Sequence, residues 1–175
     1  MNTKKIIAVA AMALLTGSQQ AGAQWKPVGD KIKTAWVEKV NPKMPWNVYP
    51  RPQLKRTQWV NLNGLWNYAI KDLQSSEPAS FDGKILVPYP IESSLSGVGK
   101  TLTKESILWY NRTFTIPSAW KGKNVKLNFG AVDWKAEVFV NGVSVGNHTG
   151  GFAPFSMDIT SALKPGSNKL SVKVF

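Results

Sequence analysis

The feature that most constrains this fold is a run of alternating apolar residues broken by the dipeptide Asn141-Gly142. Asn-Gly tolerates positive φ at both central positions of a type I′ turn, which joins two antiparallel strands through a two-residue loop. A hairpin closed by this turn would put four valines on one face, since side chains alternate along a strand. The predicted cross-strand pairs are Val140 with Val143, Val138 with Val145, and Phe139 with Ser144.

The same period of two recurs along most of the chain after residue 58. Its apolar members are Trp66, Tyr68 and Ile70, then Val125, Leu127 and Phe129, then Leu170, Val172 and Val174. Turn signals such as Asp82-Gly83, Lys121-Gly122 and Pro165-Gly166 separate these segments. Short alternating strands at this spacing predict an all-β fold, an antiparallel β-sandwich of jelly-roll type.

The first 23 residues follow the pattern of an export signal. Lys4 and Lys5 precede a short apolar core at Ile6–Leu15, and Ala21-Gly22-Ala23 supplies small residues for cleavage. We predict a signal peptide over 1–23, cleaved near Ala23, and an exported protein, periplasmic or extracellular. The apolar core is about ten residues, short of the roughly 20 that span a bilayer, so no membrane association is expected.

Residues 24–58 form a proline-rich segment, called the lead-in below. It carries +6 of the formal net charge of +12, together with five prolines that interrupt helices and sheet ladders. An extended conformation is predicted, with a weak helix signal around Lys31–Val40. The chain offers no recognisable nucleic-acid-binding module, so the charge indicates a solvated basic surface and no nucleic-acid partner. It has no cysteine, which excludes disulfides and thiolate sites.

A set of motifs in one order gives the chain a family resemblance. They are LWYNRTF, WKGKNVKLNFGAVDWKAEVFVNG and GNHTGGFAPFSMDIT, preceded by Arg51-Pro52-Gln53, LNGLWNYAI and ILVPYPIESSLSGVG, and followed by LKPGSNKLSVKV. Together they resemble the N-terminal sugar-binding domain of glycoside hydrolase family 2, which includes β-galactosidases, β-glucuronidases and β-mannosidases. The resemblance implies a galactose-binding-domain-like jelly roll over 59–175, a carbohydrate ligand and no cofactor. It also implies that the lead-in lies across this domain or its neighbours, anchored by Trp36 and Trp46.

The resemblance further implies a larger enzyme. In family 2 the catalytic glutamates lie in a later (β/α)₈ barrel, which needs about 250 residues. The chain ends at Phe175, directly after an alternating segment and before the family's Gly-Gly-Ile motif. We therefore expect a sandwich truncated at its C-terminus, a missing immunoglobulin-like and barrel portion, and a fragment inactive by itself. The alternatives are a stand-alone lectin-like carbohydrate-binding module and a purely structural module.

The residues themselves offer no catalytic or metal site. His148 is the only histidine, so any triad would need it, and it is expected in the loop after the hairpin. Asp133 and Glu137 lie about 13 Å apart along a strand, whereas retaining glycoside hydrolysis needs carboxyl groups about 5.5 Å apart. Asp158 is expected to cap the turn Ile159–Ala162.

Three loop residues are predicted to bind sugar. Aromatic faces pack against sugar C–H surfaces, and carboxylates accept hydrogen bonds from hydroxyl groups. On this chemistry the candidates are Glu92 in PYPIESSLSG and Asp133 and Trp134 in GAVDWKAE. Each has another interpretation: Trp134 can serve core or interdomain packing, and Glu92 can brace its own loop. Gly150-Gly151-Phe152 and Pro154-Phe155 are assigned to turn geometry and packing.

Overall fold

A computed structural model describes residues 25–29, 32–50 and 52–175, so the predicted signal peptide lies outside the described residues. Eight strands make up the described fold, which contains no α-helix: β1 (Gly64–Asp72), β2 (Gly83–Val87), β3 (Ser106–Thr115), β4 (Lys126–Phe129), β5 (Lys135–Val140), β6 (Val143–Thr149), β7 (Phe155–Asp158) and β8 (Ser167–Val174). The described residues also form five single turns of 3₁₀ helix. Two precede β1, namely η1 (Val37–Lys39) and η2 (Pro52–Leu54), and three lie between strands, namely η3 (Ser94–Ser96), η4 (Ser118–Trp120) and η5 (Thr160–Ala162).

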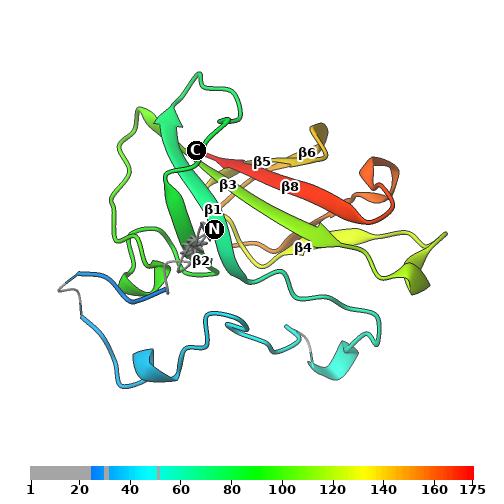
Figure 1. The fold of residues 1–175 in the computed structure, drawn as a ribbon, viewed down its shortest axis with the longest axis horizontal. Helices are drawn as coiled ribbons and strands as arrows, with labels where there is room; N and C mark the ends of the chain where they lie inside the picture. The colour runs from blue at the N-terminus through cyan, green and yellow to red at the C-terminus, as the bar shows by residue number, and fades with distance from the viewer. Residues whose placement is uncertain (1–24, 30–31, 51) are drawn as a thin grey trace, which may run out of the picture.

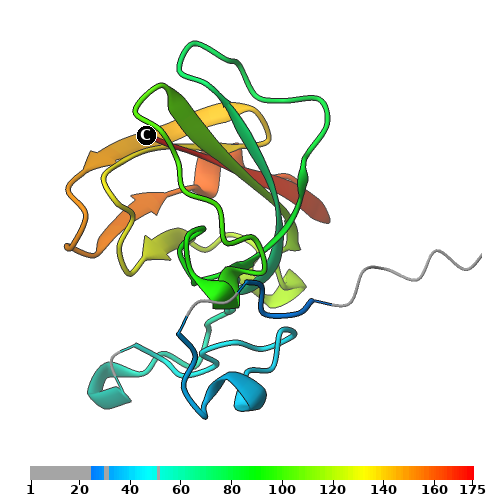
Figure 2. The same cartoon turned by 90° about the vertical axis from the view of Figure 1, so that its left-hand side faces the viewer.

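The strands form two antiparallel sheets that face each other (Figures 1 and 2). The larger has the order β2-β1-β3-β8-β5-β6, and the smaller pairs β4 with β7. Strand β8 lies between β3 and β5, so that Val172 is opposite both Tyr110 and Val138. The predicted antiparallel β-sandwich of jelly-roll type is confirmed.

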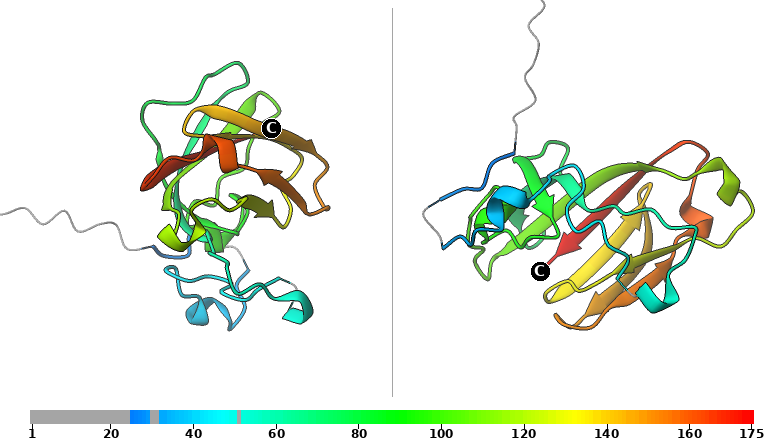
Figure 3. Two further views of the ribbon diagram at one scale, coloured as in Figure 1. Left: turned by 90° about the vertical axis from the view of Figure 1, so that its right-hand side faces the viewer. Right: turned by 90° about the horizontal axis from the view of Figure 1, so that it is seen from below.

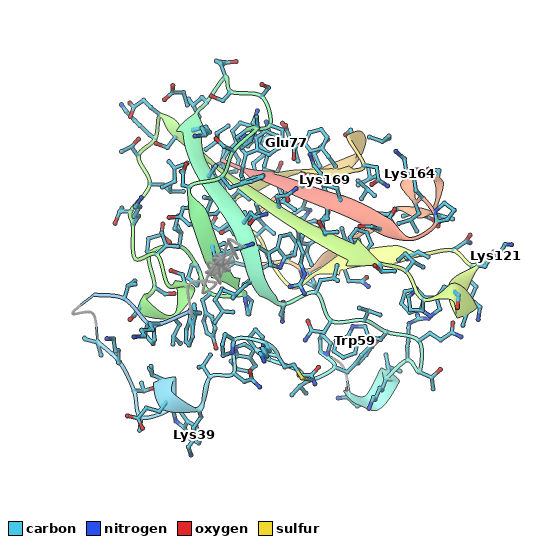
Figure 4. All side chains as sticks on the ribbon, viewed as in Figure 1. Lys39, Trp59, Glu77, Lys121, Lys164 and Lys169 are labelled. Atoms are coloured by element: carbon cyan, nitrogen blue, oxygen red, sulfur yellow. The ribbon has the colours of Figure 1, made fainter. Side chains whose placement is uncertain are left out.

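The core lies between the sheets and uses the predicted alternation. Trp66 and Tyr68 of β1 are buried, as are Leu127 of β4 and the apolar residues of β8. The opposite face of the larger sheet carries a second, smaller apolar cluster of Ala69, Ile107 and Trp109. Above that face Glu77 pairs with Lys169 of β8 at 2.9 Å, as the labels of Figure 4 show. Both faces of the large sheet are therefore partly covered.

The hairpin between β5 and β6 confirms two predicted pairs and corrects the third. Val140 is opposite Val143 and Phe139 is opposite Ser144, but Val138 is opposite Gly146 because a β-bulge shifts the register. The predicted pair of Val138 with Val145 is therefore wrong, although Val145 still packs against the main core. The bulge places one extra residue of β6 opposite β5. Gly146 supplies the needed backbone with a φ of +148°.

A buried asparagine connects the hairpin turn to the loop before β8. Asn168 Oδ1 accepts from the Lys164 N–H and from Asn141 Nδ2, both at 2.8 Å. Its Nδ2 donates to the carbonyls of Lys164 and Gly166, both at 3.0 Å. Asn141 Nδ2 also donates to the Ala162 carbonyl at 2.8 Å. This network closes the end of the sandwich near Lys164, which Figure 4 labels, at the opposite end of β8 from the C-terminus marked in Figure 1.

The lead-in runs along one side of the sandwich, outside both sheets (Figures 2 and 3). A helix was predicted around Lys31–Val40, and the described residues 32–40 form only the single turn η1. Near its start, Trp25 Nε1 donates to the Leu95 carbonyl at 3.1 Å, which attaches the segment to η3. The expected anchors Trp36 and Trp46 are 69% and 65% exposed, so they do not fasten the lead-in to this domain.

Asp158 caps the turn after β7, as predicted. Its Oδ1 accepts the N–H of Thr160 at 2.9 Å, and hydrogen bonds from the side chain and backbone of Thr160 lower the pKa of the carboxyl below its ordinary 3.8.

A carboxyl with a depressed pKa stabilises the fold fully above its ordinary pKa and loses this contribution as the pH falls through the lowered value. We expect Asp158→Asn to be less stable than the parent at pH 7. The difference should be smaller at about pH 2, because Asp158 is protonated as the pH falls through its lowered pKa, whereas an asparagine side chain is neutral at every pH. Urea midpoints at the two pH values measure this, and a difference of equal size at both would contradict the capping role.

Candidate functional site

Two of the three predicted sugar-binding residues lie at one corner of the sandwich, directly before β5. Asp133 and Trp134 are joined by a cis peptide bond. The Trp134 N–H donates to the Phe175 carbonyl at 3.4 Å, and its carbonyl accepts from the Gly150 N–H at 2.7 Å. The backbone of Trp134 is thus connected both to the residue after β8 and to the loop after β6. We call Asp133, Trp134 and the facing residues 150–152 the Asp133–Trp134 corner.

Glycine lets the loop after β6 close onto Asp133. A Cβ atom placed on Gly151 would lie 2.5 Å from Asp133 Oδ1, so a residue with a side chain would displace the carboxylate or the loop. Gly150 has a φ of +121°, in the region that favours glycine. The next residue, Phe152, is almost fully exposed. The lack of a side chain at Gly151 therefore lets this loop lie against the Asp133 carboxylate.

A stack of three aromatic rings lies next to this loop. His148 stacks on Phe155 with ring centroids 4.1 Å apart, and Phe155 stacks on Phe129 at 4.7 Å. His148 belongs to β6, opposite Ala136, so its predicted placement in a loop is wrong. Its Nε2 atom is buried and has no hydrogen-bond partner within the described ranges. The ring therefore contributes to the corner by packing.

Glu92 lies on a different loop, between β2 and η3, and its side chain is exposed. Burial raises the pKa of the Tyr110 hydroxyl far above its ordinary value, and the negative charge of nearby Glu92 raises it further. The buried Ser96 braces this loop, because its Oγ lies 3.0 Å from the Ile91 carbonyl and accepts the Val98 N–H at 3.0 Å. Ser96 therefore braces this loop, and Glu92 lies at its surface.

The contribution of Gly151 was missed in the sequence, where Gly150-Gly151 was assigned to turn geometry alone. A pair of glycines signals either a turn or a close approach of backbone to another group. The fold is needed to distinguish a turn from a close approach. Asp133 and Gly151 lie close together because β5 and β6 pair as a hairpin. The useful signal is an acidic residue before one strand of a hairpin and paired glycines after the other.

The corner combines groups suited to sugar recognition. Trp134 is 55% exposed and offers an indole surface for stacking, while the exposed Asp133 offers carboxylate oxygens as hydrogen-bond acceptors.

Among the residues that the structure describes, no group of three or more His, Asp or Glu side chains could hold a metal ion. In the same residues no helix is long and apolar enough to cross a membrane.

The two antiparallel sheets define a β-sandwich of jelly-roll type. A family profile described as "Glycosyl hydrolases family 2, sugar binding domain" matches residues 78–175, more than half of the chain. The chain therefore belongs to glycoside hydrolase family 2, as its N-terminal sugar-binding domain. Strand β1 lies ahead of the matched range and still pairs with β2 and β3 within it.

Individual relatives agree with this family. The chain is 29% identical over 134 residues to a β-glucuronidase of Paenibacillus borealis, covering 73% of this chain and 22% of that protein. It is 32% identical over 121 residues to a β-galactosidase of Thermoanaerobacter pseudethanolicus, covering 66% and 16%. Among solved structures, a Lactobacillus rhamnosus β-glucuronidase matches with a TM-score of 0.54 and 34% identity, covering 65% of this chain and 20% of that one. The chain spans about a fifth of the length of these relatives.

Proposed function

We propose that this chain is the non-catalytic carbohydrate-binding front domain of an exported family 2 glycoside hydrolase. The observation that carries the proposal is the family match over 78–175 in a chain that spans about a fifth of its relatives' length. The sandwich contributes carbohydrate contacts, and the rest of the enzyme contributes the chemistry. The export signal expected over 1–23 directs the enzyme to the periplasm or the exterior.

The chain by itself should leave glycosidic bonds intact. Hydrolysis of these bonds uses two carboxyl groups about 5.5 Å apart for retention or roughly 6.5–9.5 Å apart for inversion. A (β/α)₈ barrel that could present them needs about 250 residues, which exceeds the 175 residues of this chain. The relatives named β-glucuronidase and β-galactosidase suggest β-glucuronides and β-galactosides as the first substrates to screen.

Asp133 and Trp134 are the residues that we propose to border the sugar. Trp134 would stack on the C–H face of a pyranose ring, and Asp133, positioned against Gly151, would accept hydrogen bonds from its hydroxyl groups. Glu92 is proposed as an additional acceptor on the loop before η3. The exposed rings of Trp134 and Phe152 also support the second candidate, a stand-alone lectin-like module.

The decisive experiment reads the source DNA beyond the codon for Phe175 and assays both products. We expect the reading frame to continue for several hundred residues and to encode a barrel with two catalytic glutamates. The full product should cleave p-nitrophenyl β-glucuronide or β-galactoside, while the 175-residue chain should cleave neither. A stop codon directly after Phe175 would refute the enzyme proposal and leave the lectin-like module. Cleavage by the short chain would refute its non-catalytic role.

A further inference from the structure

A cleft on the lead-in presents two tryptophan rings to solvent. Its volume is about 630 Å³, and its lining includes Trp36, Lys39, Asn41, Trp46, Asn47 and Tyr89. Trp36 and Trp46 have the exposures of 69% and 65% given above, whereas most tryptophans in folded proteins are largely buried. An exposed apolar patch of this kind marks a surface that contacts a ligand, another protein or another domain.

The exposure of Trp46 is built into the backbone. Its φ is +50°, a left-handed conformation that is an outlier for a bulky residue. The conformation is held by Asn61 Nδ2, which donates to the Trp46 carbonyl at 3.2 Å, while the preceding Pro45 is buried. Strain of this type persists where the surroundings enforce it, and it concentrates at functional sites. The ring of Trp46 is therefore presented by a supported local structure.

The polar groups of the cleft suit a sugar beside these rings. The Asn41 side chain is oriented by the Lys43 N–H, which donates to its Oδ1 at 3.0 Å, and Asn47 adds a second exposed amide. Binding sites for small polar molecules combine apolar or aromatic walls with a few such groups. Aromatic faces for C–H surfaces and amides for hydroxyl groups are the elements of carbohydrate recognition.

The positive charge of the lead-in favours an acidic sugar as the ligand. Lys39 Nζ lies 4.4 Å from the centre of the Trp36 ring, so a cation sits directly at the aromatic surface. Between residues 32 and 58 the described part of the chain contains one acidic residue, Glu38, against Lys33, Lys39, Lys43, Lys55 and Arg56. An anionic ligand would find complementary charge here.

We propose that the lead-in cleft binds an acidic polysaccharide, a polymer of pyranose rings that carry carboxylate groups. The rings stack on Trp36 and Trp46, and the carboxylates pair with Lys39 and its basic neighbours. This site is distinct from the Asp133–Trp134 corner and would extend carbohydrate binding to a second surface of the domain. The inference rests on the proposed function in taking carbohydrate as the ligand class.

Affinity electrophoresis of the 175-residue chain tests the proposal with three polymers. The probes are polygalacturonate, a neutral galactan without carboxylates, and oligodeoxythymidylate as an anion without pyranose rings. We expect selective retardation by polygalacturonate. Trp36→Ala and Trp46→Ala should each weaken that binding about two- to tenfold. Lys39→Gln should weaken it and reduce its salt dependence, because salt screens exposed charges.

Val143→Ala serves as the control, since it removes an exposed apolar side chain that belongs to neither proposed site. It should leave polygalacturonate binding unchanged, and the urea midpoints of the cleft variants should match the parent. Equal retardation by oligodeoxythymidylate or by galactan would overturn the proposal, as would equal weakening in the Val143 variant. Binding of none of the polymers would also overturn it and would assign the rings to packing against another domain. None of these binding results depends on whether the reading frame continues beyond Phe175. The cleft proposal and the proposed enzyme function can therefore be refuted independently.

Discussion

Replacing Trp66 with alanine should lower the free energy of unfolding by about 3–5 kcal/mol, the range for losing a buried aromatic side chain. Trp66 is 6% exposed in the main core, with its ring edge-on to Tyr110 at a centroid distance of 6.5 Å. Its Nε1 also donates to the Leu62 carbonyl at 2.8 Å, where the chain enters β1. The alanine variant therefore loses apolar contacts, leaves a cavity and removes a hydrogen bond.

Urea unfolding followed by circular dichroism measures this loss without relying on tryptophan fluorescence. Trp134→Ala is the matched control, because its ring is 55% exposed and should change the free energy of unfolding by less than about 1 kcal/mol. Trp66→Phe should be intermediate: it keeps an aromatic ring, and the Leu62 carbonyl still accepts from Arg112 at 2.7 Å. Equal losses for the Trp66 and Trp134 alanine variants would show that the described core is wrong.

Asn168→Ala should lower the free energy of unfolding by about 2–4 kcal/mol, because it breaks a buried hydrogen-bond network. The side chain makes four hydrogen bonds of 2.8–3.0 Å, to the backbone of Lys164 and Gly166 and to Asn141. Truncation leaves these groups without their partner. We expect a lower urea midpoint with an unchanged slope, together with faster amide hydrogen exchange at Lys164.

Asn128 provides the matched control for Asn168. It lies on β4 with an exposed side chain, so Asn128→Ala should change the free energy of unfolding by less than about 0.5 kcal/mol. If both alanine variants lost the same stability, the loss would reflect β-sheet propensity and not the network. Unchanged hydrogen exchange at Lys164 in the Asn168 variant would contradict the described hydrogen bonds directly.

The strands were predictable because burial on one face imposes a period of two that is visible in the residues. Leu170, Val172 and Val174 are all buried on β8, as their alternation with polar residues indicated. The Asn141-Gly142 turn was predictable for a local reason, since both residues adopt positive φ. The turn depends on two adjacent residues, and the strands depend on the burial of one face.

The bulge opposite Val138 was not predictable from the neighbouring residues. It lies where β6 packs closely on the smaller sheet, since a Cβ on Gly146 would be 3.3 Å from the Met157 sulfur. The exposure of Trp36 and Trp46 on this domain was not predictable for a related reason. Composition marks a tryptophan as apolar but does not tell which surface covers it.

At the Asp133–Trp134 corner, the chemistry of the candidate residues was visible and their arrangement was not. Asp133 and Trp134 could be chosen as loop residues next to a strand, yet their relation to Gly151 depends on the pairing of β5 with β6. Glu92 shows the same limit, since its proximity to Tyr110 of β3 depends on how the loop after β2 folds. Their sugar-binding role stays a prediction.

The position of β8 has a consequence for how the protein is made. Strands β3 and β5 are joined in the large sheet only through β8, which is synthesised after both. Until residues 167–174 emerge from the ribosome, β2-β1-β3 and β5-β6 remain separate pieces, each with an unpaired edge. Such edges are templates for pairing with other chains. Translation that pauses before Ser167 would therefore leave an aggregation-prone nascent chain, and chaperone demand should be highest in that interval.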